Sequence, residues 1–598
     1  MPDRSDHETV HTYYRDRLTE LGQQRHTAEA TRTRMRLAFA FCAAVACLLV
    51  QYHAVPWWSA LIPAAAVIGL IPFYLRLQTR LARILRLLVF HDFNLERVDG
   101  SQPQSSLTGE EFRDPAHLYD RDLNILGTNS IFGLLGTVRT GIGQRGLARF
   151  LLDPASNADA LERQQAVQEL TPRTSLREEI ALLGTSRFEQ LSVSKLDTWL
   201  DEPSPVFHPA IRILLVLTSA ALIALLLAGI LHYIPWATLL PNLAAVFALH
   251  TAIAALVRSR VVPILKDSKI ASQMQTLSDG LALLQKQSFT SPRLIALQQA
   301  SRAPTDAIAA MSRIQSNFVI VEQRTKEWFF VLSLLLAAGT HAAIAIANWK
   351  RTHAQPMKTW LASFAEFEAL NALANYAFEH PENIYPEILL DNTPATFEAT
   401  ALRHPLLPNC IPNDVALNSD THFYLISGSN MSGKSTLLRT IGTSTVLALA
   451  GAPIRATSAR ISPARLCTSI ALTDSLAEAK SKFLAEVERL HAILAVASPV
   501  APPVLFLIDE IFSGTNSSDR LAAAEAVMRA LAAANTVGAL STHDLALTRI
   551  ATPELRGLNV HMASPDPADS LAFDYILKPG INTSSSALAI LRLIGIPG

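Results

Sequence analysis

A glycine-rich segment in the C-terminal third has the residue types and spacing of a phosphate-binding loop. Residues 428–435 read Gly-Ser-Asn-Met-Ser-Gly-Lys-Ser, with an apolar run before them and a proline-free segment, 437–449, after them. This context predicts strand, loop and helix. Glycines let backbone N–H groups and the start of the next helix point at a phosphate chain. The residues expected to bind the nucleotide are Gly428, Ser429, Asn430, Met431, Ser432, Gly433, Lys434, Ser435 and Thr436.

A pair of acids predicts how the nucleotide is held and cleaved. Residues 504–508 form an unbroken apolar run, typical of a strand buried on both faces of a parallel sheet, and Asp509 and Glu510 follow it. We expect Lys434 to reach the β- and γ-phosphates, and Ser435 and Asp509 to bind Mg²⁺. Glu510 would orient or deprotonate the attacking water. These residues predict a site for ATP and Mg²⁺.

Length and composition indicate several domains and a membrane. The 598 residues exceed what a single core holds, and 51 basic against 51 acidic residues leave no global positive charge to attract nucleic acid. Hydrophobic residues make up 49% and charged residues 17%, which is unusual for a soluble ATPase. The four cysteines lack metal-ligand spacing, so we interpret them as reduced packing residues in a protein that faces the cytosol.

Two pairs of apolar segments predict transmembrane hairpins. The first pair covers 37–52 and 57–75, each near the roughly 17–25 residues needed to cross a bilayer. Arginines flank the pair on both sides and the turn carries none, so the positive-inside bias places both flanks in the cytoplasm. The second pair, 213–231 and 236–257, repeats this arrangement. We therefore expect a multi-pass membrane protein with a cytoplasmic ATP site; buried helices of a large α-helical domain are the alternative.

A fifth apolar run, from Trp328 to Ala347, has no partner segment. A fifth span would put the ATP site outside the cell, so we interpret the run as a core helix, although its composition also permits a span. From Thr396 onward, strand-like runs alternate with helices, which implies a parallel sheet covered by helices. The predicted parts are a cytoplasmic tail at 1–34, a hairpin at 35–76, a helical domain at 77–205, a second hairpin at 206–260, a helical lever region at 261–395 and an α/β ATPase domain at 396–598.

The glycine loop resembles that of the MutS family of DNA mismatch-repair ATPases, most of all its membrane-associated relatives. Family members carry Gly-Pro-Asn-Met-Gly-Gly-Lys-Ser/Thr, and this chain retains Asn430 and Met431. Residues 511–519 are similar to the stretch that follows the family's two acids, and Ser541-Thr542-His543 corresponds to its Thr-His element. The resemblance implies a P-loop ATPase domain of the MutS/ABC type. It also implies that His543 senses the γ-phosphate and that Asn430 helps to position the water.

Two further correspondences concern the adenine and a second subunit. Residues 404–407 and 412–415 resemble the segment that leads into the family's ATPase domain, which would place Ile411 and Asn413 near the adenine. Residues 481–486 are similar to the family's Ser-Thr-Phe-Met-x-Glu, whose serine contacts the nucleotide of the partner subunit. The resemblance thus implies a homodimer in which Ser481 completes the other site. Taken alone, this stretch fits a solvated helix face equally well.

The resemblance does not extend to the mismatch reader. The only Phe-x-Glu considered, Phe364-Ala365-Glu366, lies in a late helical segment, and we find neither a clear clamp insertion nor the family's C-terminal helix-turn-helix. The predicted function is a membrane-anchored ATPase whose dimer closes on ATP as a clamp, by resemblance on double-stranded or mismatched DNA in repair. The alternative is the same switch acting on a protein or lipid partner without DNA. Half of an ABC-type transporter would need a Leu-Ser-Gly-Gly-Gln element, which the chain does not have.

Overall fold

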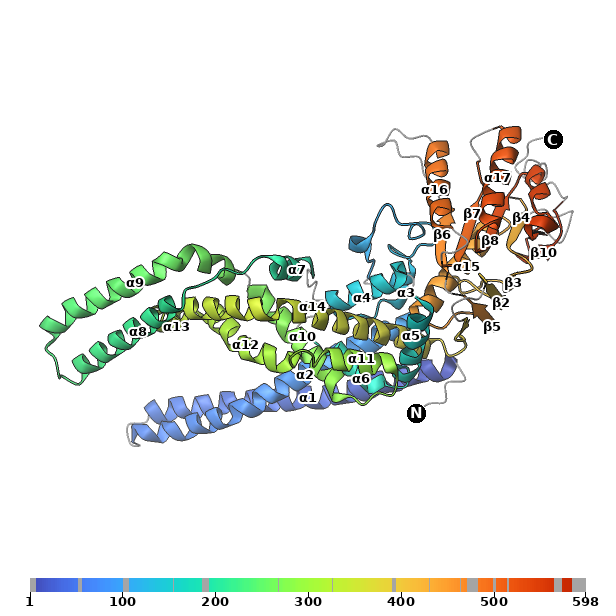
Figure 1. Cartoon of the computed structure of the whole chain (residues 1–598). Helices are drawn as coiled ribbons and strands as arrows, with labels where there is room; N and C mark the ends of the chain where they lie inside the picture. The colour runs from blue at the N-terminus through green and yellow to red at the C-terminus, as the bar shows by residue number, and fades with distance from the viewer. Residues whose placement is uncertain are drawn as a thin grey trace, which may run out of the picture. The chain divides into compact units, whose positions relative to one another are not determined.

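The chain forms two compact units in a computed structural model, and Figure 1 labels its helices and strands. The first unit comprises residues 1–138, 144–182 and 369–598, and the second comprises 139–143 and 183–368. The structure describes residues 7–51, 56–99, 107–153, 155–184, 193–266, 268–324, 326–389, 394–429, 431–462, 464–470, 482–497, 502–512, 516–563 and 573–582.

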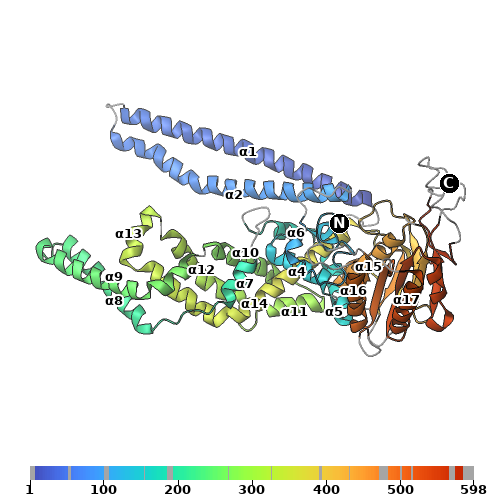
Figure 2. The ribbon, with the colours of Figure 1, turned by 90° about the horizontal axis from the view of Figure 1, so that it is seen from above.

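Two long antiparallel helices open the first unit, α1 (His7–Gln51) and α2 (Leu61–Val98), and Figure 2 shows them side by side. The halves of α1 and α2 that lie away from the connecting turn meet along a helical-period seam that buries Leu21, Ala28, Leu77, Leu81 and Ile84. Residues 7–34, which the sequence suggested as a separate tail, thus continue into the first apolar segment as one helix. The halves near the turn instead expose large apolar side chains: Leu37, Phe41, Leu48, Val50, Ile62, Ile68, Phe73 and Leu75.

Buried ion pairs fix the base of this helical pair within the first unit. Arg97 on α2 donates to Glu379, the last residue of α14 (Ala338–Glu379), over 2.9 Å, and both side chains are buried. Asn375 donates to the other oxygen of that carboxylate over 2.8 Å. Arg17 on α1 donates to both oxygens of Glu178 on α6 (Thr174–Ala181). Separating the buried Arg97–Glu379 pair would leave an unpaired charge inside the protein, so this pair holds the base of α2 against the end of α14.

The first unit also contains short helices that follow this pair in the chain. They are η2 (Glu110–Phe112), α3 (Ile131–Leu135), most of α4 (Gly141–Leu152), α5 (Asn157–Leu170) and α6. Ser130 and Ser156 cap α3 and α5 by accepting hydrogen bonds from backbone N–H groups of their first turns.

The second unit is helical throughout its described residues. Its elements are α7 (Val193–Asp201), α8 (Pro209–Ile230), α9 (Trp236–Lys266), α10 (Ser268–Lys286), α11 (Pro292–Ala300), α12 (Ala307–Gln323), α13 (Glu327–Leu335) and α14 up to residue 368. The helices α8 and α9 form an antiparallel pair that buries Leu215, Leu222 and Leu239, and Thr218 is hydrogen-bonded to His250 over 2.8 Å inside it.

Four helices in the described part of the chain are long and apolar enough to cross a membrane, namely α1, α2, α8 and α9. The fifth apolar run is not one straight helix. It breaks between α13 and α14, whose axes differ by 70°, and it would make a fifth span only if both pieces crossed together.

The C-terminal part of the first unit contains a six-stranded sheet in the order β10-β9-β4-β8-β7-β6. Five strands are parallel and β10 is antiparallel to β9, so the predicted parallel sheet is confirmed for these five. Leu507 on β7 faces α15 (Lys434–Ala450), and its neighbours Phe506 and Ile508 pack with α16 (Lys482–Val496) and α17 (Ser517–Ala532). The strands are β4 (Phe423–Ser427), β6 (Arg465–Ser469), β7 (Val504–Asp509), β8 (Thr536–Thr542), β9 (Gly557–His561) and β10 (Lys578–Pro579).

A second, four-stranded sheet was not anticipated. Its order is β1-β5-β2-β3, with bounds Glu387–Ile388, Ser458–Ile461, Phe397–Leu402 and Asn413–Leu417 respectively. Its short strands have alternating burial, and three of them precede the glycine loop while β5 follows it. This sheet carries the segment 403–412 toward the loop.

Candidate nucleotide-binding site

The glycine loop joins β4 to α15, as predicted from the sequence. Gly433 has a φ of +100°, which a residue with a side chain rarely adopts, and a Cβ on Gly428 would lie 2.5 Å from the carbonyl oxygen of Met562. Ser432 is buried, and its hydroxyl has no hydrogen-bond partner among the residues that the structure describes. A tight cradle with an unsatisfied donor suits an anionic ligand. Asn430 lies outside the described residues, whereas the neighbouring Met431 is exposed, with a φ of +70°.

Lys434 begins α15 and is only 5% exposed. Its ammonium group donates to the carbonyl oxygens of Gly428 and Ser429 over 2.9 and 2.8 Å, so it bridges the loop on which a phosphate would rest. Burial lowers the pKa of Lys434, while the nearby carboxylates of Asp509 and Glu510 act in the opposite direction. The lysine is thus held at the centre of the loop, within the field of both acids.

Asp509, at the end of β7, connects the first turn of α15 with the end of β8. The Ser435 hydroxyl donates to one carboxylate oxygen of Asp509 over 2.5 Å, and the Ser541 hydroxyl donates to the other. The parallel register of β7 and β8 places Asp509 opposite Ser541, which explains this contact. A hydroxyl and a carboxylate are the hard oxygen ligands that Mg²⁺ accepts beside nucleotide phosphates. Ser435 and Asp509 therefore fit the predicted metal role.

Glu510 and His543 form a pair at the open side of the site. Glu510 has a φ of +54°, and its N–H donates to the Ser541 carbonyl over 3.0 Å, which turns its side chain away from the strand direction. One carboxylate oxygen lies 3.1 Å from Nδ1 of His543, the residue after β8. Both side chains are partly exposed, so water can reach them. This arrangement suits a base held in place by a neighbouring imidazole.

Glu486 supports this side of the site from α16. Its buried carboxylate accepts a hydrogen bond from the N–H of Phe512, two residues after Glu510, and the Phe483 ring packs near the Phe512 ring at 6.0 Å. Ser481, the predicted partner-subunit contact, lies outside the described residues, just before the start of α16.

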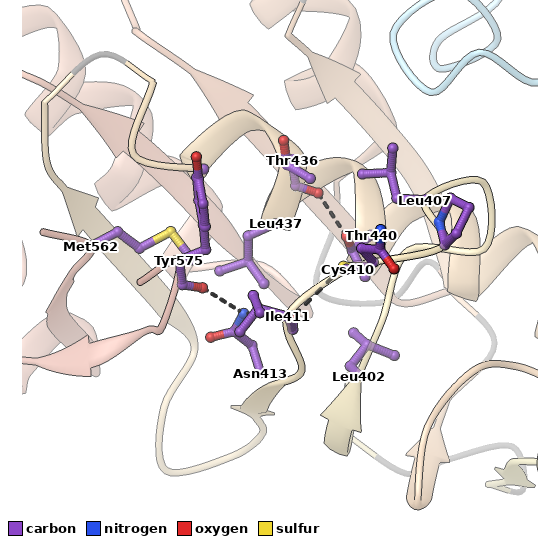
Figure 3. A pocket seen from close by; sticks show the side chains of 13 residues that line it. Leu402, Leu407, Cys410, Ile411, Asn413, Thr436, Leu437, Thr440, Met562 and Tyr575 are labelled. Atoms are coloured by element: carbon purple, nitrogen blue, oxygen red, sulfur yellow. Dashed lines mark hydrogen bonds between the residues drawn. The ribbon is translucent and has the colours of Figure 1, made fainter. Parts of the chain in front are cut away.

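A pocket of about 350 Å³ adjoins the loop at Gly433 and Thr436, and Figure 3 shows its lining side chains. Ile411 lies in its wall, and its place near the adenine stays a prediction. The Asn413 side chain donates to the carbonyl of Tyr575 over 3.0 Å and accepts from the N–H of Leu577 over 2.7 Å, so it ties residues 575–577 to the pocket. The lining consists of Leu402, Leu407, Pro408, Asn409, Cys410, Ile411, Asn413, Gly433, Thr436, Leu437, Thr440, Met562 and Tyr575.

Residues near 120 pack against the domain that contains the glycine loop, and these contacts were not predicted from the sequence. Asp122 accepts hydrogen bonds from the Thr468 hydroxyl and the Ile470 N–H, and Arg439 on α15 donates to the Asp122 carbonyl. A Cβ on Gly442 of α15 would lie 2.7 Å from Leu123. The helix that begins at Lys434 is therefore packed directly against this segment.

The structure brings Lys434, Ser435, Asp509, Glu510 and His543 to one edge of the sheet. Ser429, Ser432 and Gly433 belong to the same loop, and Thr436 lines the adjoining pocket. The sequence analysis named Ser541 only as part of the Thr-His element and missed its contact with Asp509, and it did not name Tyr575. Ser541 carried a usable signal, because it is a hydroxyl at the end of an apolar strand, whereas Tyr575 reaches the pocket only through long-range folding.

Comparison with known proteins identifies the same region. Residues 424–598 match a family model described as MutS domain V. Over 237 residues the chain is 32% identical to a protein of Halobacterium salinarum named DNA mismatch repair protein MutS 2. That alignment covers 38% of this chain and 27% of the relative, so the chain spans about a quarter of the relative's length.

Proposed function

Because its C-terminal ATPase domain makes this chain a member of the MutS family, we propose that it is an ATP-driven switch anchored in a membrane. The observation that carries the proposal is the meeting of Lys434, Ser435, Asp509 and Glu510 around one glycine loop, next to a pocket large enough for a base. The family model covers residues 424–598 of the chain.

The residues divide into binding and chemical roles. Lys434 and the loop N–H groups neutralise the phosphates, and Ile411 and Tyr575 enclose the base. Mg²⁺ held by Ser435 and Asp509 supplies positive charge against the phosphoryl oxygens. Glu510 accepts the proton of the attacking water, and His543 fixes the carboxylate through their 3.1 Å contact. Asn430, which lies outside the described residues, is proposed by resemblance to help place the water.

We also propose that two ATPase domains face each other across bound ATP. The first turns of α16 expose Phe483 and Val487, which lie one helical turn apart and are 42% and 38% exposed. This apolar strip follows Ser481, the residue that the resemblance assigns to the partner's nucleotide. Glutamine in place of Glu510 should trap a dimer with ATP, detectable by light scattering, whereas a monomer at every nucleotide state would exclude the clamp.

Membrane anchoring is supported by the apolar halves of the two helical pairs. Their exposed side chains, such as Leu37, Phe41, Ile213 and Leu256, form large apolar surfaces of a kind that soluble proteins rarely expose to water. Arginines flank each pair on its base side, so the ATPase domain would be cytoplasmic. We expect the full chain to pellet with membranes and to resist carbonate extraction. Release into the soluble fraction would make these helices part of a protein core.

The proposal has two forms, which differ in the partner that the clamp encloses. The name of the Halobacterium relative favours DNA, and mismatched or branched duplexes are then the substrates to test. The balanced charge of this chain favours a protein or lipid partner instead. ATPase rates with and without perfect, mismatched and branched duplexes distinguish the two forms. An ATPase rate that DNA stimulates, with a stimulation that falls steeply as salt rises, indicates contacts with DNA phosphates. An ATPase rate that DNA leaves unchanged at low salt excludes DNA as the clamped partner.

A further inference from the structure

Among the side chains that the structure describes in the short helix α13, residues 329–335, those on its outward face are apolar. Phe330, Val331, Leu332 and Leu334 are 54%, 64%, 48% and 43% exposed, whereas Ser333 on the opposite face is buried. A helix that faces water normally presents polar residues on its outer side. The exposed face of α13 therefore requires an apolar neighbour.

The break after α13 places this helix beside the base of the α8–α9 pair. Ala337, which has a φ of +46°, packs against Leu215 on α8 and Ile253 on α9. Further along α14, Ala343, Ile344 and Ala347 pack against Phe207, Val257 and Val261. The start of α14 thus runs along the cytoplasmic ends of α8 and α9.

The arginines that flank α8 and α9 indicate how far this contact lies below the membrane surface. Leu215 lies three residues beyond Arg212, and Ile253 lies five residues before Arg258, which correspond to roughly 4.5 and 7.5 Å along a helix. Ala337 would therefore sit about one turn inside the boundary that these arginines mark. At this level α8 and α9 also expose Leu214, Val216 and Leu256, so the outward face of α13 continues an apolar surface already assigned to lipid.

Geometry argues against a fifth span. The nine residues of α13 measure roughly 14 Å and the apolar start of α14, residues 338–347, roughly 15 Å. With axes 70° apart, the two together would rise only about 20 Å if α14 stood along the membrane normal, less than the ~30 Å of hydrocarbon. Figure 2 shows α13 set across the direction of α14.

We propose that α13 lies in the plane of the cytoplasmic leaflet, with its Phe330–Val331–Leu334 face against the acyl chains. This inference rests on the membrane anchoring proposed above and adds its topology: four spans and one in-plane helix. Lys326, which is exposed at the start of α13, then lies at headgroup level, and the residues on both sides of the apolar run stay in the cytoplasm. The fifth apolar run is accordingly neither a span nor a core helix along its first half.

The test uses a fluorescent amino acid placed by amber suppression in the full-length protein, reconstituted in vesicles. Phe330 is the test position and Val331 a second one, in case the first variant folds poorly. Leu249 is the lipid control, because it lies nine residues, roughly 13.5 Å, from Arg258. Ser312, exposed on α12, is the water control. Lipids brominated at known depths quench from the bilayer, and iodide quenches from water.

The proposal predicts that position 330 is quenched about twice as strongly by bromines close to the headgroup as by bromines near the chain end, since in-plane helices sit about 5–10 Å deep. Position 249 should show the reverse order, and position 312 should respond to iodide alone. Iodide quenching at 330 with lipid quenching at 249 overturns the in-plane helix but leaves the anchoring intact. Iodide quenching at 249 overturns the anchoring itself. Deep quenching at 330 indicates insertion, and no quenching by either agent indicates cover by protein; both overturn the inference.

Discussion

Glutamine at position 510 should separate hydrolysis from binding. The Glu510 N–H contact to Ser541 comes from the backbone, and glutamine has nearly the same shape, so the local fold should be retained. Lys434, Ser435 and Asp509 are unchanged, so the affinity for Mg·ATP should stay close to that of the wild type. The rate should fall about 10²–10⁴-fold, which is what a positioned general base contributes. At about 1.36 kcal/mol per tenfold, this is a barrier increase of about 2.7–5.4 kcal/mol.

The assay is phosphate release in a single turnover, with nucleotide affinity measured on the same preparation. The matched control is His543→Asn, which removes the imidazole that lies 3.1 Å from Glu510 but leaves the base. A hydrogen bond to a charged group is worth about 1.5–3 kcal/mol, so this variant should lose about tenfold to a hundredfold in rate. Unimpaired turnover in Glu510→Gln would refute the role of the base, and lost ATP binding would show that Glu510 acts in binding instead.

Three further predictions concern packing and the pocket. Burial raises the pKa of Glu368 to about 7 against hydrogen bonds from Thr140, above the ordinary 4.5 of an unfolded chain. The folded state therefore holds this proton more tightly, so the stability that Glu368 contributes should be complete below about pH 4.5 and be lost as the pH rises through about 7. Glu368→Gln should remove this component from the pH dependence of the thermal midpoint, and a profile like that of the wild type contradicts the assignment. Arg97→Ala removes the cation that pairs with the buried Glu379 carboxylate and should cost about 3–5 kcal/mol of unfolding free energy by denaturant titration, which Arg97→Met with Glu379→Leu should largely restore; equal losses in both variants would count against the ion pair. Asn413→Ala removes two hydrogen bonds to residues 575–577 and should raise the ATP dissociation constant about tenfold by calorimetry, and wild-type affinity would exclude Asn413 from shaping the pocket.

Local patterns carried the prediction of the ATPase site. The loop from Gly428 to Ser435 and the apolar strand before Asp509 are contiguous in sequence, and a parallel sheet has few ways to arrange them. By contrast, Ser541 reaches Asp509 through strand pairing, and Asp122 contacts Thr468 across more than 300 residues of sequence. Such contacts depend on register and docking, which a single sequence does not specify.

Composition predicted the apolar helices but not their extent. Residues 7–34 were predicted to be a polar tail because most of their side chains are polar. They form the first part of α1, and only Leu21 and a few other residues of the segment are buried in the seam. The run from Trp328 to Ala347 has the length of a span, and nothing in its composition reveals the bend between α13 and α14. The second sheet was missed because strands such as Asn413–Leu417 are short and half exposed.

Lys434 gives the most direct test of the nucleotide site. Its buried ammonium group already bridges the carbonyls of Gly428 and Ser429, and no other lysine in the described residues is held by the loop in this way. The measurement is the affinity of the purified full-length protein for Mg·ATP, for wild type, Lys434→Ala and the exposed-lysine control Lys358→Ala. The account predicts binding by wild type and Lys358→Ala and none by Lys434→Ala. Wild-type affinity in Lys434→Ala would contradict it.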